Sequence, residues 1–306
     1  MKLSLLEFGL RKERASAPDI LQEVIEYSCK ADQLGFHRLW FTEHHNLSPA
    51  WNSPDMILPI VAGMTERIRI GIGGVLLSIH SPYRVALNYK LLAALFPGRI
   101  DLGIANSQVA FDIASCALDN ELLPENYTSR FFERFKQLDD FLHDTYHGKY
   151  EHVIITPQNT IPPTVWSLGS SHNSLPHLIK LKNLNFSFSV FHRNISLDAC
   201  REIVDKTRET YYNEYRQTPQ INIAFTGICA SSKKAAVQKF AATGNKEDGY
   251  PYNCVIGTAE TFFEKLSEYA EKLGVDEFIF HDLSRNNEDR LAALKALSKK
   301  FNLGKS

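Results

Sequence analysis

Strand-like and helix-like segments alternate along almost the whole chain, and this alternation constrains the fold more than any other feature. Short apolar runs typical of buried strands are separated by longer segments with apolar residues at helical spacing. Eight strand–helix units indicate an α/β fold, a closed (β/α)8 TIM barrel rather than an open doubly wound sheet. The predicted strands are Lys2–Phe8, Phe36–Thr42, Arg69–Leu77, Arg99–Ala105, Thr164–Leu168, Phe186–Phe191, Ile221–Cys229 and Glu277–His281.

Proline and capping residues mark the predicted helices between these strands. Pro18 and Asp19 open the first helix, and Gly35 ends it. The other predicted helices are Pro54–Met64, Pro82–Phe96, Ser129–Tyr146, Ser174–Lys182, Leu197–Arg216, Lys233–Ala242, Ala259–Leu273 and Glu288–Phe301.

The length of 306 residues fits two average domains, but it also fits one (β/α)8 barrel. No linker-like change of composition divides the chain. We therefore expect a single barrel domain over residues 1–306, with loop insertions at the carboxyl face near Ala105–Asn126 and Thr243–Asn253. A discontinuous lid subdomain is the alternative.

Charge and cysteine content exclude several classes of partner. A net charge of −1 gives no general attraction to nucleic acid or to an anionic membrane. The five cysteines are scattered and include no CxxC pair, which suits a protein of the reducing cytoplasm. The chain contains no apolar run of about 18 residues, so no membrane span is expected.

Polar side chains gather where the predicted strands end, which is the active-site face of such a barrel. Glu43, His44, His45 and Asn46 follow the second strand, and these groups suit acid–base chemistry or ligand binding. The alternative is that they only cap loops. Further polar groups at strand ends are Ser78, His80, Asn106, Ser107, Gln108, His192, Arg193, His281 and Asp282.

The segment Gly169–Ser174 has the form of an anion-binding loop. It follows a strand, opens a helix and offers backbone N–H groups with the hydroxyls of Ser171 and Ser174, so a phosphate would fit. An ordinary serine helix cap is the alternative. Walker A and GxGxxG motifs are both absent from the sequence.

A metal site is not expected from the histidines. His44 and His45 are adjacent, and neighbouring residues of a strand point to opposite sides, so the two should not share one ion. The HxH pair found in many barrel hydrolases is also missing.

Several stretches together resemble the bacterial luciferase-like flavin-dependent monooxygenases, which are (β/α)8 barrels. The stretches are LGFHRLWFTEHHN, RIRIGIGGVLLSIHSPYRVA, LFPGRIDLGIA, VWSLGSSHNSLPHLIKL and VIGTAETFFEKLSEYAEKLGVDEFIF. The resemblance implies that reduced FMN, supplied by a separate flavin reductase, binds at the carboxyl face. It also implies that oxygen adds to the flavin C4a carbon and that the resulting hydroperoxide oxidises a small or medium organic substrate.

The resemblance also assigns roles to individual residues. His44 matches a catalytic histidine, as base or hydrogen-bond partner, with Glu43 beside it in the motif. Gly73 and Gly74 match a pair of small residues joined by a non-proline cis bond beneath the flavin. The residues expected to bind the flavin phosphate are Ser170, Ser171, Ser174 and, after the fourth strand, Asn106.

Two departures from the family pattern keep alternatives open. Asn106 stands where many relatives carry an arginine on the flavin phosphate, and Ala105 stands where luciferase has a reactive cysteine. An F420- or flavin-linked oxidoreductase is one alternative, although the basic residues that would distinguish F420 binding are not seen. A non-catalytic flavin-binding partner subunit is another. The resemblance further implies a homodimer formed through Pro54–Met64 and Pro82–Phe96.

Overall fold

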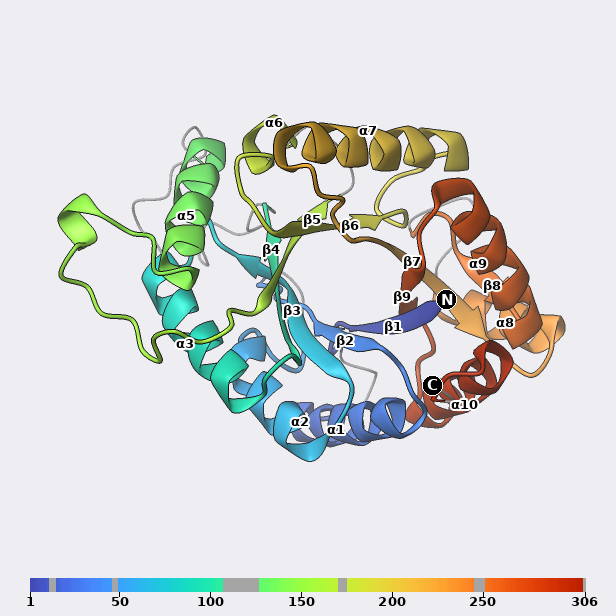
Figure 1. Cartoon of the computed structure of the whole chain (residues 1–306). Helices are drawn as coiled ribbons and strands as arrows, with labels where there is room; N and C mark the ends of the chain where they lie inside the picture. Colours follow the sequence, from blue (N-terminus) through green and yellow to red (C-terminus); the bar gives the residue numbers. More distant parts are fainter. Residues whose placement is uncertain (11–14, 46–48, 107–126, 170–174, 245–250, 305–306) are drawn as a thin grey trace.

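The strands close into a parallel barrel surrounded by helices (Figure 1). The computed structural model describes residues 1–10, 15–45, 49–106, 127–169, 175–244 and 251–304. Strands β1 to β7 pair in sequence order, and β9 pairs with both β7 and β1, which closes a ring of eight. The ring strands are β1 (Lys2–Glu7), β2 (Arg38–Phe41), β3 (Arg69–Leu76), β4 (Ile100–Ala105), β5 (Thr164–Gly169), β6 (Leu184–Ser189), β7 (Ile221–Cys229) and β9 (Glu277–Asp282).

The predicted (β/α)8 barrel is thus confirmed, and the helices lie outside it (Figure 1). At the start of α1, the Ser16 side chain accepts from the Asp19 N–H while the Asp19 carboxylate accepts from the Ser16 N–H, as the sequence pattern favours. The helices are α1 (Ala17–Gln33), α2 (Leu58–Met64), α3 (Pro82–Leu95), α5 (Tyr127–Leu142), α6 (Leu175–Leu178), α7 (Leu197–Tyr215), α8 (Lys233–Ala242), α9 (Ala259–Leu273) and α10 (Asn287–Phe301).

Three local predictions need correction. The expected helix Pro54–Met64 is divided into a 3-10 turn, η1 (Pro54–Met56), and α2, because Pro59 has no N–H to bond the preceding turn. The expected helix Ser174–Lys182 is described only over the four residues of α6. Strand β6 begins and ends two residues earlier than predicted, directly after Asn183, which adopts a left-handed backbone with φ of 65°.

A short strand that the sequence reading missed, β8 (Val255–Gly257), pairs with the end of β7 outside the ring. Three residues are too few to show a period. Of the two expected insertions, residues 107–126 and 245–250 lie outside the described residues.

Charged and aromatic side chains fill the amino end of the barrel interior. The Arg38 guanidinium lies 3.1 Å from Asp101 Oδ1 and 3.2 Å from Glu277 Oε1, and it stacks 4.4 Å from the ring centroid of Trp166. A buried charge is costly unless it is paired, and here each charge has partners. The barrel interior is therefore filled at this end, which leaves the carboxyl end of the interior for ligands.

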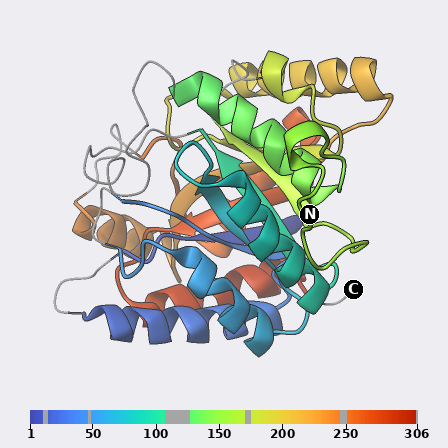
Figure 2. The same cartoon turned by 90° about the vertical axis from the view of Figure 1, so that its left-hand side faces the viewer.

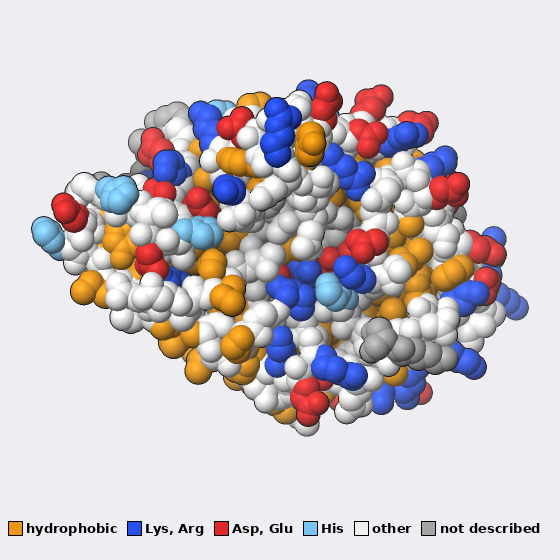
Figure 3. Space-filling model, viewed as in Figure 1, with side chains coloured by type: hydrophobic (Ala, Val, Ile, Leu, Met, Phe, Trp, Pro, Cys, Tyr) orange, Lys and Arg blue, Asp and Glu red, His pale blue; other side chains and the backbone are white. Residues whose placement is uncertain are grey.

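Strand β1 begins and helix α10 ends at the amino end of the barrel (Figure 2). Viewed from that end, hydrophobic side chains gather at the lower left, over α2 and α3 (Figure 3). Met56 of η1 is 71% exposed and Leu95 of α3 is 60% exposed, whereas Val61 and Val85 are buried against the barrel. These elements therefore carry more apolar surface than packing on the barrel uses. No helix among the described residues is long and apolar enough to span a membrane.

Candidate active site

The side chains of His44 and His45, just after β2, point in different directions. The Nδ1 atom of His44 lies 3.1 Å from the Thr42 hydroxyl, whereas the Nε2 atom of His45 lies 2.7 Å from Glu43 Oε1. Contacts between residues two apart follow from the twofold period of an extended chain. The expectation that His44 and His45 point in opposite directions is thus confirmed.

His44 lies among aromatic rings at the carboxyl end of the barrel. Its imidazole stacks on Phe8 with 5.0 Å between ring centroids, and Phe8 in turn lies 4.3 Å from the ring of His281. Burial lowers the pKa of His44, and the charge of His192 lowers it further, against a smaller opposing effect of Glu43. Burial also lowers the pKa of His281 to about 4. Both imidazoles are therefore neutral near pH 7, and a neutral imidazole can accept a proton.

Glu43 ties the end of β2 to the end of β3. Its Oε2 atom accepts a hydrogen bond of 3.1 Å from the Leu76 N–H, and its Oε1 atom contacts the Nε2 atoms of His45 and His80 at 2.7 and 2.6 Å. Burial raises the pKa of Glu43, but the hydrogen bonds from His45 and His80 outweigh it and bring the pKa to about 2. Glu43 thus acts on His44 through its charge, while its described hydrogen bonds are made with Leu76, His45 and His80.

The loop that carries His80 is fixed by α5. Arg134 donates to the carbonyl oxygens of Ser78 and His80 at 2.8 and 3.0 Å. Burial lowers the pKa of His80, but the hydrogen bond and charge of Glu43, helped by Asp55, raise it above the ordinary value. Sequence reasoning placed His80 on this face but missed Asp55 and Arg134, because neither follows a strand and an arginine on an amphipathic helix is typical of a solvent-facing position.

The expected flavin-binding glycines lie next to these groups on β3. The Gly73–Gly74 peptide bond is cis, as the family resemblance implied. A β-carbon at Gly74 would lie 2.5 Å from Leu168 Cδ1 and 2.9 Å from the Gly103 carbonyl oxygen, so the position excludes a side chain. An apolar cluster, formed by Leu76, Ile79, Ala105 and Leu168, lies at the same strand ends.

Asn106 directly follows β4 beside this cluster. Its Oδ1 atom is buried and has no hydrogen-bond partner within the described ranges. A buried acceptor without a partner is costly, and such atoms in native proteins usually face a ligand, an ion or water. The other expected phosphate ligands, Ser170, Ser171 and Ser174, lie outside the described residues.

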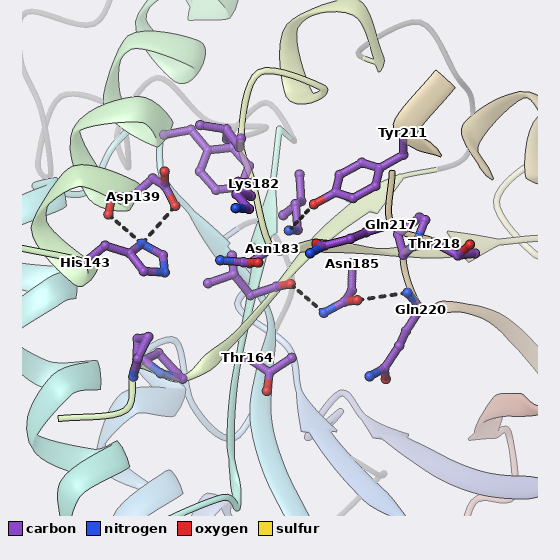
Figure 4. Close-up of a pocket in the computed structure, with 17 residues that line it drawn as sticks. Asp139, His143, Thr164, Lys182, Asn183, Asn185, Tyr211, Gln217, Thr218 and Gln220 are labelled. Atoms are coloured by element: carbon purple, nitrogen blue, oxygen red, sulfur yellow. Dashed lines mark hydrogen bonds and ion pairs between the residues drawn. The ribbon is translucent and has the colours of Figure 1, made fainter. Parts of the chain in front are cut away.

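A separate cavity of about 400 Å³ opens at the other end of the barrel, where β5 and β6 begin (Figure 4). Some of its polar groups are bonded to one another. The His143 imidazole contacts Asp139, and Asn185 accepts from the Gln220 N–H at 2.9 Å. This end of a (β/α)8 barrel serves stability rather than catalysis, so we place the candidate active site at the carboxyl end.

Comparison with known proteins shows the family to which the chain is related. The model of the luciferase-like monooxygenase family matches residues 2–245. N-acetyl-S-alkylcysteine monooxygenase from Bacillus subtilis is 26% identical over 333 aligned positions, which cover 97% of this chain and 97% of that protein.

Solved structures share the fold. Apo-MsnO8 has a TM-score of 0.84 at 25% identity, covering 99% of this chain and 98% of that one. The oxygenating constituent of 3,6-diketocamphane monooxygenase from Pseudomonas putida, in complex with FMN, has a TM-score of 0.77 at 17% identity, covering 98% and 97%. A less similar chain, an F420-dependent secondary alcohol dehydrogenase, has a TM-score of 0.70 at 12% identity, covering all of both chains, so the fold alone does not select the cofactor. Because the family model spans most of the sequence, the chain belongs to the luciferase-like monooxygenase family.

Proposed function

We propose that the protein is an FMN-dependent monooxygenase that uses reduced flavin and O2 to oxidise a small or medium organic substrate. The observation that carries the proposal is the neutral His44, stacked on Phe8 at the carboxyl end of a barrel that belongs to a monooxygenase family. His44 is a proton acceptor packed against an aromatic ring, which suits an oxidation in which a proton must be held or removed.

The described residues fit a flavin at this end of the barrel. Gly73 and Gly74 would lie against the ring system, and Asn106 Oδ1 would accept a hydrogen bond from the cofactor. Ser170, Ser171 and Ser174, which lie outside the described residues, would bind the phosphate. When bound, reduced FMN supplies the electrons that activate O2 for transfer of one oxygen atom to the substrate.

His44 would hold a proton at its Nε2 atom. The Nδ1 atom contacts Thr42, so an imidazole that donates from Nδ1 to the threonine hydroxyl leaves Nε2 as the basic nitrogen. Asn52 Nδ2 donates to the His44 carbonyl oxygen at 2.6 Å and fixes the backbone there. Beyond Phe8, the ring contacts continue to His281 at 4.3 Å and from His281 to Phe191 at 6.4 Å between centroids.

One observation favours a second candidate, a flavin-binding subunit without catalysis of its own. Asn106 gives no charge to a phosphate, where an arginine would give a charge-assisted bond, so flavin affinity should be weaker than in relatives that carry the arginine. The Glu43 and His44 pair argues for catalysis, since a silent subunit has no need of a basic imidazole.

Anaerobic binding followed by one turnover tests the proposal. The protein is titrated with reduced FMN and, in parallel, with reduced F420, and the complexes are mixed with ¹⁸O2 and candidate substrates. N-acetyl-S-alkylcysteines are tried first, because the Bacillus subtilis relative is named for them. One ¹⁸O atom in the product, detected by mass spectrometry with FMN only, supports the proposal. Flavin binding with no labelled product from any substrate favours the silent subunit, and turnover with F420 alone favours the other oxidoreductase.

The assembly we propose is a homodimer, supplied with reduced flavin by a separate reductase. The exposed apolar side chains along η1, α2 and α3 form one surface, and burying it would remove apolar area from water. The members of this surface, named here the α2–α3 face, are Met56, Ile60, Met64, Leu91 and Leu95.

A further inference from the structure

Three metal-binding side chains converge beside the candidate active site. The Oε1 atom of Glu43 and the Nε2 atoms of His45 and His80 lie within 4.8 Å of one another. Both imidazoles address the same carboxylate oxygen, at 2.7 and 2.6 Å. Both nitrogens and the oxygen thus lie close enough together that an ion placed between the three atoms would bond all of them.

The surroundings hold these groups in place. Glu43 Oε2 accepts from the Leu76 N–H, which leaves Oε1 as the oxygen that faces the histidines. The His80 carbonyl is bonded by Arg134, which fixes the loop. Such outer contacts orient ligands in known metal sites and strengthen binding.

The site is also accessible from one side. The side chain of Glu43 is 4% exposed, that of His45 15% and that of His80 29%, so an ion can enter past the histidines and keep a water molecule. Two histidines, one carboxylate and a water form a donor set that suits Zn²⁺ and similar transition ions rather than Mg²⁺ or Ca²⁺.

The donor atoms need to move little to accept an ion. Bonds of about 2.0 to 2.1 Å in a tetrahedral site separate neighbouring ligand atoms by about 3.3 Å. The imidazole nitrogens would therefore retreat from Oε1 by less than about 1 Å, which small rotations of the two partly buried imidazoles supply. Asp55 adds a negative charge close to His80, which also favours a cation.

We propose that Glu43, His45 and His80 form a binding site for a divalent transition metal ion of the Zn²⁺ class, which fastens the end of β2 to the end of β3. Each ligand nitrogen must present its lone pair to the ion in order to bind it. The site does not include His44, and it stands whether or not the proposed monooxygenase activity is found.

Metal titration of the flavin-free full chain tests the site. After treatment with EDTA and its removal, the protein is titrated with ZnCl2 by calorimetry and with CoCl2 by visible absorption. The variants are His45→Gln and His80→Gln, and the control is His152→Gln, which changes an exposed histidine elsewhere. We expect one ion per chain, affinity at least tenfold weaker in each ligand variant, and no change in the control.

Thermal melting makes the test independent of folding defects. Zn²⁺ should raise the Tm of the parent and the control but not of the ligand variants, since an ion that binds only the folded state stabilises it. Equal affinity in all four proteins, or no saturable binding by the folded parent, would overturn the proposal and leave a hydrogen-bonded cluster.

Discussion

Replacement of Glu43 by glutamine should destabilise the protein in a pH-dependent way. The change keeps the shape of the side chain and its hydrogen bond from Leu76 but removes the charge that faces His45 and His80. The pKa of Glu43 falls from an ordinary 4.5 to about 2, and each pH unit corresponds to about 1.4 kcal/mol. The carboxylate therefore contributes about 3 kcal/mol to the free energy of unfolding.

The sign of the pH dependence follows from both partners. Glu43 has a lowered pKa, so its contribution is complete above pH 4.5 and is lost as the pH falls toward 2. His80 has a raised pKa, so its contribution is complete below pH 6.5 and is lost as the pH rises through the raised value. Both shifts describe one interaction and are not added. The difference between parent and Glu43→Gln should be largest between about pH 5 and 6.5.

Urea unfolding at several pH values, with EDTA present, measures this difference. The control is Glu271→Gln, which removes a charge from the exposed surface of α9 and should cost less than about 0.5 kcal/mol at every pH. A Glu43→Gln deficit below about 1 kcal/mol at pH 6, or one that stays constant from pH 3 to 7, would refute the reasoning.

Three further predictions concern catalysis, cofactor and assembly. His44→Ala should keep the fold but slow substrate oxidation by about 10²- to 10⁴-fold, with electrons diverted to hydrogen peroxide in single-turnover assays, whereas His45→Ala should lower the Tm more than it slows the reaction. The double change Ser171→Ala and Ser174→Ala should weaken FMN binding by about 1–3 kcal/mol and riboflavin binding little, and equal losses would place the phosphate elsewhere. Leu95→Asp on the α2–α3 face should convert a sedimenting dimer into a 34.7 kDa monomer, and a parent that is already monomeric at micromolar concentration contradicts the dimer.

The fold was largely predictable because a (β/α)8 barrel repeats one local pattern. Strands buried on both faces form continuous apolar runs, and helices between them show a 3.6-residue period, so β7 and α8 begin and end where predicted. Errors arose where one residue overrides the period. Pro59 divides a helix and Asn183 turns the chain early into β6.

The candidate site was predictable only where strand geometry decides it. The opposite directions of His44 and His45 follow from the twofold period of an extended chain. The contact of Glu43 with His80 joins residues 37 positions apart, and it depends on the conformation of the loop after β3. Arg134 of α5 holds that loop by donating to backbone carbonyl oxygens. Every residue has a carbonyl oxygen, so the sequence does not indicate which ones an arginine will bond.

Glu43, His44 and His45 are adjacent in the sequence, but their side chains after β2 have two different roles. Glu43 and His45 face β3 and hold the loop that carries His80, while His44 faces Phe8 with an imidazole kept neutral by burial. The two sides still communicate through charge, because ionised Glu43 opposes the lowering of the His44 pKa. Neutralising Glu43, by substitution or by a bound cation, should therefore lower the His44 pKa further and make His44 a weaker base without moving it. An effect of Glu43 on the pH profile of oxidation is then expected even though its own bonds go to the neighbouring strand.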